Sequence, residues 1–88
     1  MNSAPVVMYL KPWCPYCASA RALLQSKQVD VQEIDIEAEP ARRDEMIERS
    51  GGRWTVPQIF VGEHYVGGSD DLHALEAAGK LDPLLAGQ

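Results

Sequence analysis

The stretch KPWCPYC, residues 11–17, contains both cysteines of the chain, with two residues between them. It follows the apolar run Val6–Leu10, whose β-branched and aromatic residues are typical of a buried strand. Pro15 is favoured at the first position of a helix, and good helix formers continue to about Gln28. The stretch therefore predicts a strand, a turn and a helix, with both cysteines in the first turn of that helix.

Length and composition indicate an ordinary globular protein. The 88 residues are 45% hydrophobic and 24% charged, and the formal net charge is −5. A chain of this size and composition forms one small domain, so we expect a single domain over residues 1–88. The acidic residues gather between Asp30 and Glu48, and an acidic chain is a poor nucleic-acid binder because phosphate binding needs a basic surface.

The expected location follows from what the sequence does not contain. No apolar run approaches the roughly 20 residues that a membrane-spanning helix needs. The opening residues MNSAPVV lack a basic segment followed by a long apolar stretch, so no secretory signal is visible. We therefore expect a cytoplasmic monomer with no nucleic-acid or membrane partner, in a compartment where thiols are kept reduced.

The rest of the pattern predicts an α/β protein. Ser69 is the expected N-cap of a helix whose first turn contains two aspartates. The order β-α-β-α-β-β-α predicts a four-stranded mixed sheet with parallel first strands, a terminal hairpin and helices on both faces. After the first helix, the expected elements are a strand at 31–36, a helix at 40–50, strands at 58–61 and 64–66, a helix from 69 to about 78 and a short turn or helix at 81–85.

Three roles are open to the cysteine pair: a structural disulfide, a zinc site or a reactive dithiol. A disulfide across two intervening residues closes a loop too short to stabilise the chain much, and it is unusual in the cytoplasm. Zinc needs about four ligands, and besides the cysteines only His64 and His73 are available, at a spacing that does not support a site. The pattern favours reactive thiols and no metal.

The two cysteines are not equivalent. At the helix start, Cys14 faces unpaired backbone N–H groups and the positive end of the helix dipole, and Lys11 adds positive charge nearby. These features stabilise a thiolate, which is the attacking form of cysteine. Cys17 shares a helix face with Ala20 and Leu24, so we expect it to be buried and to resolve a disulfide formed on Cys14.

Three motifs resemble the signatures of a dithiol glutaredoxin. They are CPYC at residues 14–17, TVP at 55–57 and GSDD at 68–71. They occur in the family's order and at its usual spacing, and the similarity extends from Val6 to Leu85, nearest to the small bacterial members. The resemblance implies a thioredoxin fold in which the bond between Val56 and Pro57 is cis.

The resemblance also implies a site for glutathione. The Val56 backbone would pair with the cysteinyl part of the tripeptide, and Lys11 and Arg53 would hold its glycine carboxylate. The backbone of residues 69–70 would receive the γ-glutamyl carboxylate at a helix N-terminus, and Asp71 would accept the ammonium group. The implied glutathione-binding residues are Lys11, Tyr16, Arg53, Thr55, Val56, Pro57, Gly68, Ser69, Asp70 and Asp71.

Outside the family context, simpler interpretations of the charged residues remain open. Asp70 and Asp71 are also what the first turn of a helix favours, and Lys11 and Arg53 would by default be solvated surface charges. Gly67 and Gly68, which directly precede Ser69, and the TVP motif upstream favour the ligand-binding interpretation.

Two tryptophans depart from the commoner glutaredoxin pattern. Trp13 and Trp54 occupy positions where small or polar residues are usual. They would either contact a protein partner at the rim of the groove or cover the edge of the core. Position 69 is serine where close relatives often have cysteine, which leaves the main mechanism unchanged.

The function implied by the resemblance is that of a glutathione-dependent thiol–disulfide oxidoreductase. Cys14 and Cys17 would be the catalytic residues, glutathione a co-substrate, and no cofactor would be tightly bound. The expected partners are glutathione, glutathionylated or disulfide-containing proteins with ribonucleotide reductase as a candidate, and glutathione reductase acting through glutathione disulfide. Two alternatives are a glutathione-ligated 2Fe–2S carrier, which Pro15 disfavours in this family, and a redoxin reduced by thioredoxin reductase.

Overall fold

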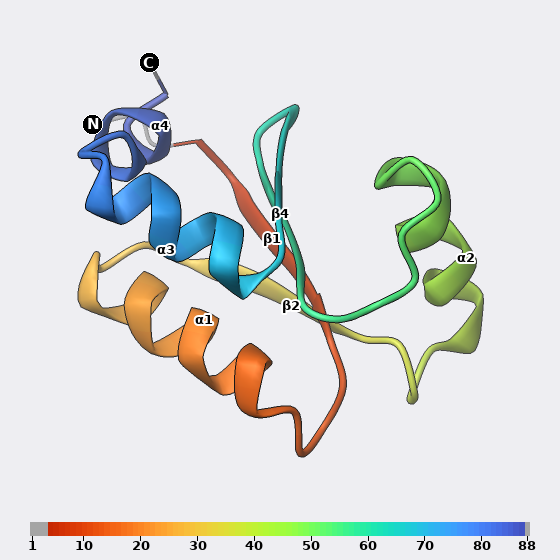
Figure 1. Cartoon of the computed structure of the whole chain (residues 1–88). Helices are drawn as coiled ribbons and strands as arrows, with labels where there is room; N and C mark the ends of the chain where they lie inside the picture. Colours follow the sequence, from red (N-terminus) through yellow and green to blue (C-terminus); the bar gives the residue numbers. More distant parts are fainter. Residues whose placement is uncertain (1–3, 88) are drawn as a thin grey trace.

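The computed structural model describes residues 4–87, which form four strands and four helices (Figure 1). The elements follow the predicted order. In chain order they are β1 Val6–Leu10, α1 Pro15–Ser26, β2 Val31–Asp35, α2 Pro40–Arg49, β3 Gln58–Val61, β4 His64–Gly67, α3 Ser69–Ala77 and α4 Leu81–Leu85.

The strands form one mixed sheet in the order β2-β1-β3-β4. Strand β1 pairs in parallel with β2 and antiparallel with β3, and β3 pairs antiparallel with β4 as a hairpin. This confirms the predicted sheet. Because Tyr9 near the end of β1 pairs with Gln58 at the start of β3, the loop after β1 lies beside the loop that precedes β3. The topology therefore brings KPWCPYC and the TVP motif together.

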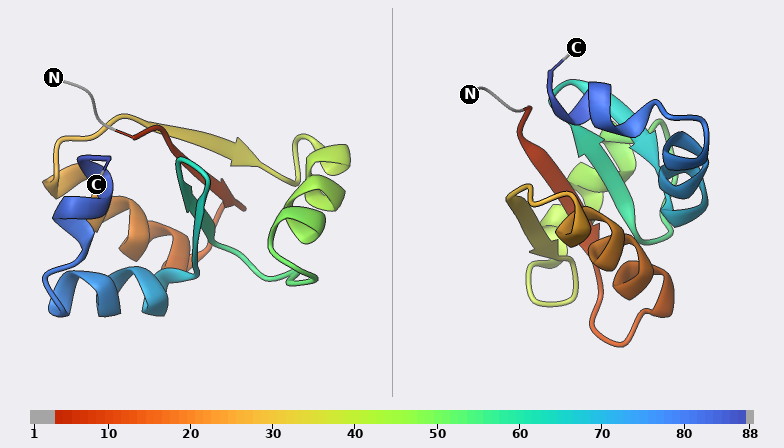
Figure 2. Two further views of the ribbon diagram at one scale, coloured as in Figure 1. Left: turned by 90° about the horizontal axis from the view of Figure 1, so that it is seen from above. Right: turned by 90° about the vertical axis from the view of Figure 1, so that its left-hand side faces the viewer.

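Helices cover both faces of the sheet, as predicted. Alternate side chains of a strand point to opposite faces, so β1 and β3 each contribute to two cores. Figure 2 shows the strands between α1 and α3 on one side and α2 on the other. The larger core includes Met8, Cys17, Ala20, Leu24, Ile59 and Leu72, and the smaller one consists of Tyr9, Ile34, Ile36, Met46 and Phe60.

Five predicted ends differ by one or two residues, and β2, α2 and α3 each end one residue earlier than expected. Helix α1 ends at Ser26 because Gln28 has a left-handed backbone (φ 58°), which stops the helix before the expected end. Strand β4 includes Gly67, one residue beyond the expected end.

The expected N-cap of α3 is wrong. The cap is Gly68, whose extended backbone (φ −91°, ψ −167°) precedes the helix, and Ser69 is the first helical residue with its side chain buried. The Gly68 N–H donates a hydrogen bond of 2.9 Å to the Asp71 carboxylate. The Asp71 carboxylate thus makes the reciprocal contact of a capping box, in which the third helical residue accepts the N–H of the cap residue.

Candidate active site

Cys14 is the N-cap residue of α1, as the sequence predicts. Its backbone is extended, and its Sγ accepts a hydrogen bond of 3.3 Å from the Cys17 N–H. Pro15 occupies the first helical turn and has no N–H of its own. The N–H groups of the first turn and the helix dipole therefore stabilise negative charge on the Cys14 sulfur. On its other side this sulfur lies 3.9 Å from the Val56 carbonyl oxygen.

Cys17 is buried in the larger core and is only 2% exposed, whereas Cys14 is half-buried. Burial, followed by the hydrogen bond to Cys14, raises the pKa of the Cys17 thiol to about 12. The expected difference in burial between the two cysteines is confirmed. The Cys14 sulfur is thus partly accessible at the helix N-terminus, whereas the Cys17 thiol is enclosed and stays protonated at physiological pH.

The reduced protein is expected to lose stability as the pH rises above about 9. The pKa of the Cys17 thiol rises from 9.0, the value of a free cysteine, to about 12 in the folded chain. Between these values the unfolded chain releases a proton that the folded chain keeps, so rising pH favours unfolding. The stabilisation that the neutral, buried Cys17 thiol contributes is therefore fully present below pH 9. It is lost as the pH rises from there to about 12.

Urea unfolding of the wild type and of Cys17→Ala, followed under reducing conditions from neutral to alkaline pH, measures this effect. The wild type should lose more stability than the variant above pH 9, because only the wild type has the buried thiol. Other groups that titrate in this range, such as Tyr9, are common to both proteins and cancel in the comparison. Parallel pH profiles for the two proteins would contradict the argument.

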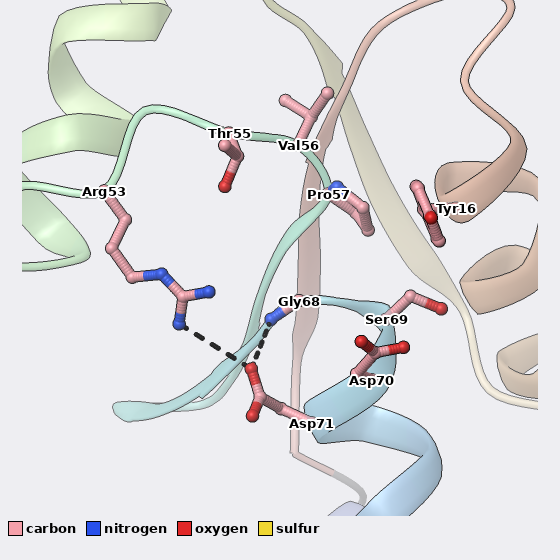
Figure 3. Close-up of a pocket in the computed structure, with 9 residues that line it drawn as sticks. All are labelled: Tyr16, Arg53, Thr55, Val56, Pro57, Gly68, Ser69, Asp70 and Asp71. Carbon is pink, nitrogen blue, oxygen red and sulfur yellow. Dashed lines mark hydrogen bonds and ion pairs between the residues drawn. The ribbon is translucent and has the colours of Figure 1, made fainter.

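A groove of about 400 Å³ lies next to Val56, the residue whose carbonyl group faces the Cys14 sulfur. Three segments form it: the start of α1, the loop before β3 and the start of α3 (Figure 3). The structure brings together every implied glutathione-binding residue except Lys11. The lining residues are Tyr16, Arg53, Thr55, Val56, Pro57, Gly68, Ser69, Asp70 and Asp71. The Val56–Pro57 bond is cis, which confirms the expectation from the resemblance.

Opposite charges face each other across this groove. Asp71 Oδ2 lies 3.6 Å from Arg53 Nη1 and also accepts the Gly68 N–H, as Figure 3 shows. Arg53 and Asp71 are each 50% exposed, and an ion pair in such a position contributes only about 0–1 kcal/mol to stability. The pair is therefore easily exchanged for contacts with a charged ligand.

A buried polar network supports the loop that contains Val56, and sequence reasoning missed it. Gln58 is fully buried, and its Nε2 donates hydrogen bonds to the Thr55 carbonyl oxygen at 2.9 Å and to Thr55 Oγ1 at 3.2 Å. Its Oε1 accepts a hydrogen bond of 2.5 Å from Tyr65. A glutamine inside a strand that is otherwise apolar was the available signal, because a buried amide needs partners.

Lys11 and the two tryptophans lie outside this groove. Lys11 and Trp13 border a second groove of about 410 Å³, which Cys14 and Cys17 also line. Trp13 is 98% exposed and Trp54 is 64% exposed, which disfavours the alternative that they cover the edge of the core. Trp13 also has a left-handed backbone (φ 63°), a conformation that costs a non-glycine residue about 1–3 kcal/mol.

The fold and the site together define a class of protein. A four-stranded mixed sheet with helices on both faces, a C-x-x-C pair at the start of α1 and a cis proline beside it are the features of a thioredoxin-fold protein with a dithiol site.

Comparison with known proteins gives the family. The Glutaredoxin family model matches residues 6–66. A glutaredoxin from Pseudomonas aeruginosa is 58% identical over 82 residues, which cover 93% of this chain and 96% of the relative. The solution structure of a Brucella melitensis glutaredoxin is 55% identical, with a TM-score of 0.84 and coverage of 98% of this chain and 92% of that one. Buckwheat glutaredoxin, solved in complex with glutathione, is 29% identical, with a TM-score of 0.84 and coverage of 93% and 76%.

The chain belongs to the glutaredoxin family. This confirms the resemblance drawn from the three motifs and the thioredoxin fold that it implied. The protein is accordingly an oxidoreductase with a glutathione-dependent redox function.

Two further observations concern residues 4–87. None of the helices in this part of the chain is long and apolar enough to span a membrane. Within the same residues, no three histidine, cysteine or acidic side chains are grouped so that they could hold a metal ion.

Proposed function

We propose that the protein reduces glutathione mixed disulfides through Cys14 alone, and protein disulfides through Cys14 and Cys17 together. The observation that carries this proposal is the position of the Cys14 sulfur, at a helix N-terminus and 3.9 Å from the Val56 carbonyl oxygen of the groove. The complex of buckwheat glutaredoxin with glutathione supports the same ligand for this chain.

The groove suits the charges of glutathione, a tripeptide with two carboxylates and one ammonium group. We assign the γ-glutamyl carboxylate to the N–H groups at the start of α3, its ammonium group to Asp71 and the cysteinyl backbone to Val56. Arg53 and Lys11 are assigned to the glycine carboxylate, and Arg53 has the stronger support because it lines the groove itself. The other lining residues assigned to the ligand are Tyr16, Thr55, Pro57, Gly68, Ser69 and Asp70.

The route through Cys14 alone has two exchange steps. The Cys14 thiolate attacks the glutathione sulfur of a mixed disulfide, the protein thiolate leaves and takes up a proton, and Cys14 becomes bonded to glutathione. A second glutathione, as thiolate, then attacks the glutathione sulfur of that bond, so that glutathione disulfide leaves and the Cys14 thiolate is restored. Glutathione reductase returns glutathione disulfide to two thiols.

The route through both cysteines begins with attack of Cys14 on one sulfur of a protein disulfide. The second protein sulfur leaves as a thiolate, and a mixed disulfide remains on Cys14. Cys17 then loses its proton and attacks the Cys14 sulfur, which releases the reduced protein and forms the Cys14–Cys17 disulfide. Two glutathione molecules reduce that disulfide. The 3.3 Å contact between the Cys17 N–H and the Cys14 sulfur supports this resolving step because it holds the two residues together.

The finer biological assignments belong to the same proposal. We propose a monomer of one domain that acts in the cytoplasm and supplies electrons to glutathionylated or disulfide-containing proteins, among which ribonucleotide reductase is a candidate. No nucleic acid, membrane or tightly bound cofactor is needed for either route.

Gly67→Ala is expected to raise the KM for a glutathione mixed disulfide by about tenfold. This is the loss of affinity expected when one hydrogen bond to a charged group is removed. Gly67 has a φ of 115°, and a Cβ added there would lie 2.3 Å from Asp71 Oδ2. The alanine would therefore displace the carboxylate from Gly68 and from the groove. Steady-state kinetics with varied mixed disulfide measure the change.

Gly79→Ala is the matched control for this variant. Gly79 also has a positive φ, 71°, but a Cβ there would meet no atom within 4 Å. Both alanines should lower stability through backbone strain, and only Gly67→Ala should change KM. Equal KM values for the two variants would contradict the role of Asp71.

A coupled assay tests the proposed function. Purified protein is mixed with NADPH, glutathione, glutathione reductase and the mixed disulfide of glutathione and cysteine, and the oxidation of NADPH is followed. Turnover well above the uncatalysed exchange is expected. Turnover only when thioredoxin reductase replaces glutathione and its reductase would favour the redoxin alternative. A visible absorption band after anaerobic purification would favour the cluster carrier.

A further inference from the structure

Three large apolar side chains are exposed in the part of the chain that the structure describes, and each belongs to a segment that forms the site. Trp13 is 98% exposed, and Tyr16 and Trp54 are each 64% exposed. Trp13 and Tyr16 flank Cys14 in the sequence, and Trp54 is two residues from Val56, whose carbonyl oxygen is 3.9 Å from the Cys14 sulfur. A soluble protein that gathers exposed apolar side chains at one place commonly binds a partner there.

The groove assigned to glutathione does not use the two tryptophans. Its lining includes Tyr16 but neither Trp13 nor Trp54. Trp13 instead borders the second groove, whose lining is largely apolar and includes Cys14. A tripeptide in the first groove therefore leaves both indole rings available to a second binding partner.

The fold itself gives no reason for a tryptophan at position 13. The side chain is almost fully exposed, so it adds little to either core, and its backbone has the left-handed conformation that bulky residues disfavour. Contact with a partner would account for a large apolar ring in this position, because tryptophan is among the residues that dominate binding at interfaces.

We propose that Trp13 and Trp54 form a docking surface for the polypeptide part of a disulfide substrate. The proposal rests on the proposed function. When Cys14 attacks the glutathione sulfur of a mixed disulfide, the protein sulfur is still bonded to that sulfur, so the residues next to the protein's cysteine must lie on the surface around Cys14. Trp13 directly precedes Cys14, and Trp54 is two residues before Val56, whose carbonyl oxygen faces the Cys14 sulfur, so we assign both rings to that surface. Because they offer rings rather than charges, the segment that fits is an extended one with apolar residues beside its cysteine.

The test compares three disulfides of glutathione on the same protein. One is bonded to free cysteine, one to a short peptide with Phe and Leu beside its cysteine, and one to the same peptide with Gly and Ser in those places. For Trp13→Ala and Trp54→Ala we expect kcat/KM with the apolar peptide to fall about tenfold each, mainly through KM. Turnover of the disulfide with free cysteine should be unchanged. Trp13→Tyr and Trp54→Tyr keep a ring and should restore most of the loss.

The outcomes separate the docking surface from the proposed function. If the wild type turns over all three disulfides and the alanine variants match it on each, the docking surface is refuted and the proposed function stands. An equal loss on all three disulfides would place the tryptophans in the glutathione site instead. Sedimentation is run on the wild type and on the double variant Trp13→Ala and Trp54→Ala. If the wild type is a dimer and the double variant is a monomer, the two tryptophans mediate self-association and the proposal is wrong.

The docking surface can also be tested without turnover. If the wild type turns over none of the disulfides, the proposed function fails. Tryptophan fluorescence of Cys14→Ser, titrated with the apolar peptide in its unmodified form, then reports docking alone. A saturable change with the apolar peptide and not with its Gly and Ser counterpart supports the surface, and no change with either refutes it.

Discussion

Replacing Cys14 with serine is expected to lower turnover of both glutathione mixed disulfides and protein disulfides by about a thousandfold or more, as removal of a catalytic nucleophile does. A serine hydroxyl is not ionised near neutral pH and cannot form a disulfide, so neither route can begin. The helix N-terminus that stabilises a thiolate at this position remains, because the Cys17 N–H can donate to a hydroxyl as it does to the sulfur. The loss should therefore appear in kcat rather than as unfolding.

The coupled glutathione assay and urea unfolding, run side by side, check this expectation. Ala22→Ser is a suitable control, because it introduces the same residue at an exposed position of α1 away from the site. The control should have wild-type turnover and similar stability. Substantial residual turnover in Cys14→Ser would show that another group is the nucleophile.

Replacing Cys17 with serine is expected to separate the two routes. The proposed route for deglutathionylation uses only Cys14, so turnover of a glutathione mixed disulfide should stay within about a few-fold of the wild type. Reduction of an intramolecular protein disulfide should fall by about a thousandfold, because the mixed disulfide on Cys14 then has no neighbouring thiol to resolve it. Assaying one preparation of the variant with both substrates gives the ratio of its deglutathionylation rate to its rate of protein-disulfide reduction directly.

Position 17 requires care in the choice of variants, because it is 2% exposed. A serine there buries a hydroxyl in an apolar core, which lowers stability, whereas Cys17→Ala leaves a small cavity and adds no polar group. Both variants should lose the same route, which ties the loss to the missing thiol. If both lose deglutathionylation as well while remaining folded, Cys17 is not simply the resolver.

Much of the fold was predictable because its signals are local. Pro15 marks the start of α1, and the helical spacing of Cys17, Ala20 and Leu24 identifies the buried face without any tertiary information. The order of elements then restricts the sheet to a parallel first pair and a terminal hairpin. The unequal burial of the two cysteines follows from these local patterns alone.

The parts that depend on distant contacts were harder to predict. Cap preferences favour Ser69, but the structure uses Gly68 because the Asp71 carboxylate already satisfies its N–H. The contacts that Gln58 makes with Tyr65 and the preceding loop also require tertiary structure, since a sequence shows an amide but not its partners. The cis bond was implied by family resemblance and not by any property of the residues around it.

The ion pair across the groove has a consequence for how the ligand enters. Arg53 Nη1 lies 3.6 Å from Asp71 Oδ2, so the groove contains one positive and one negative side chain before any ligand binds. In the binding mode proposed above, a tripeptide that brings a carboxylate to Arg53 and an ammonium group to Asp71 replaces one internal ion pair with two intermolecular ones. The net charge of these two side chains stays zero throughout. Binding by such an exchange depends only weakly on ionic strength, unlike capture of an anion by an uncompensated cationic patch.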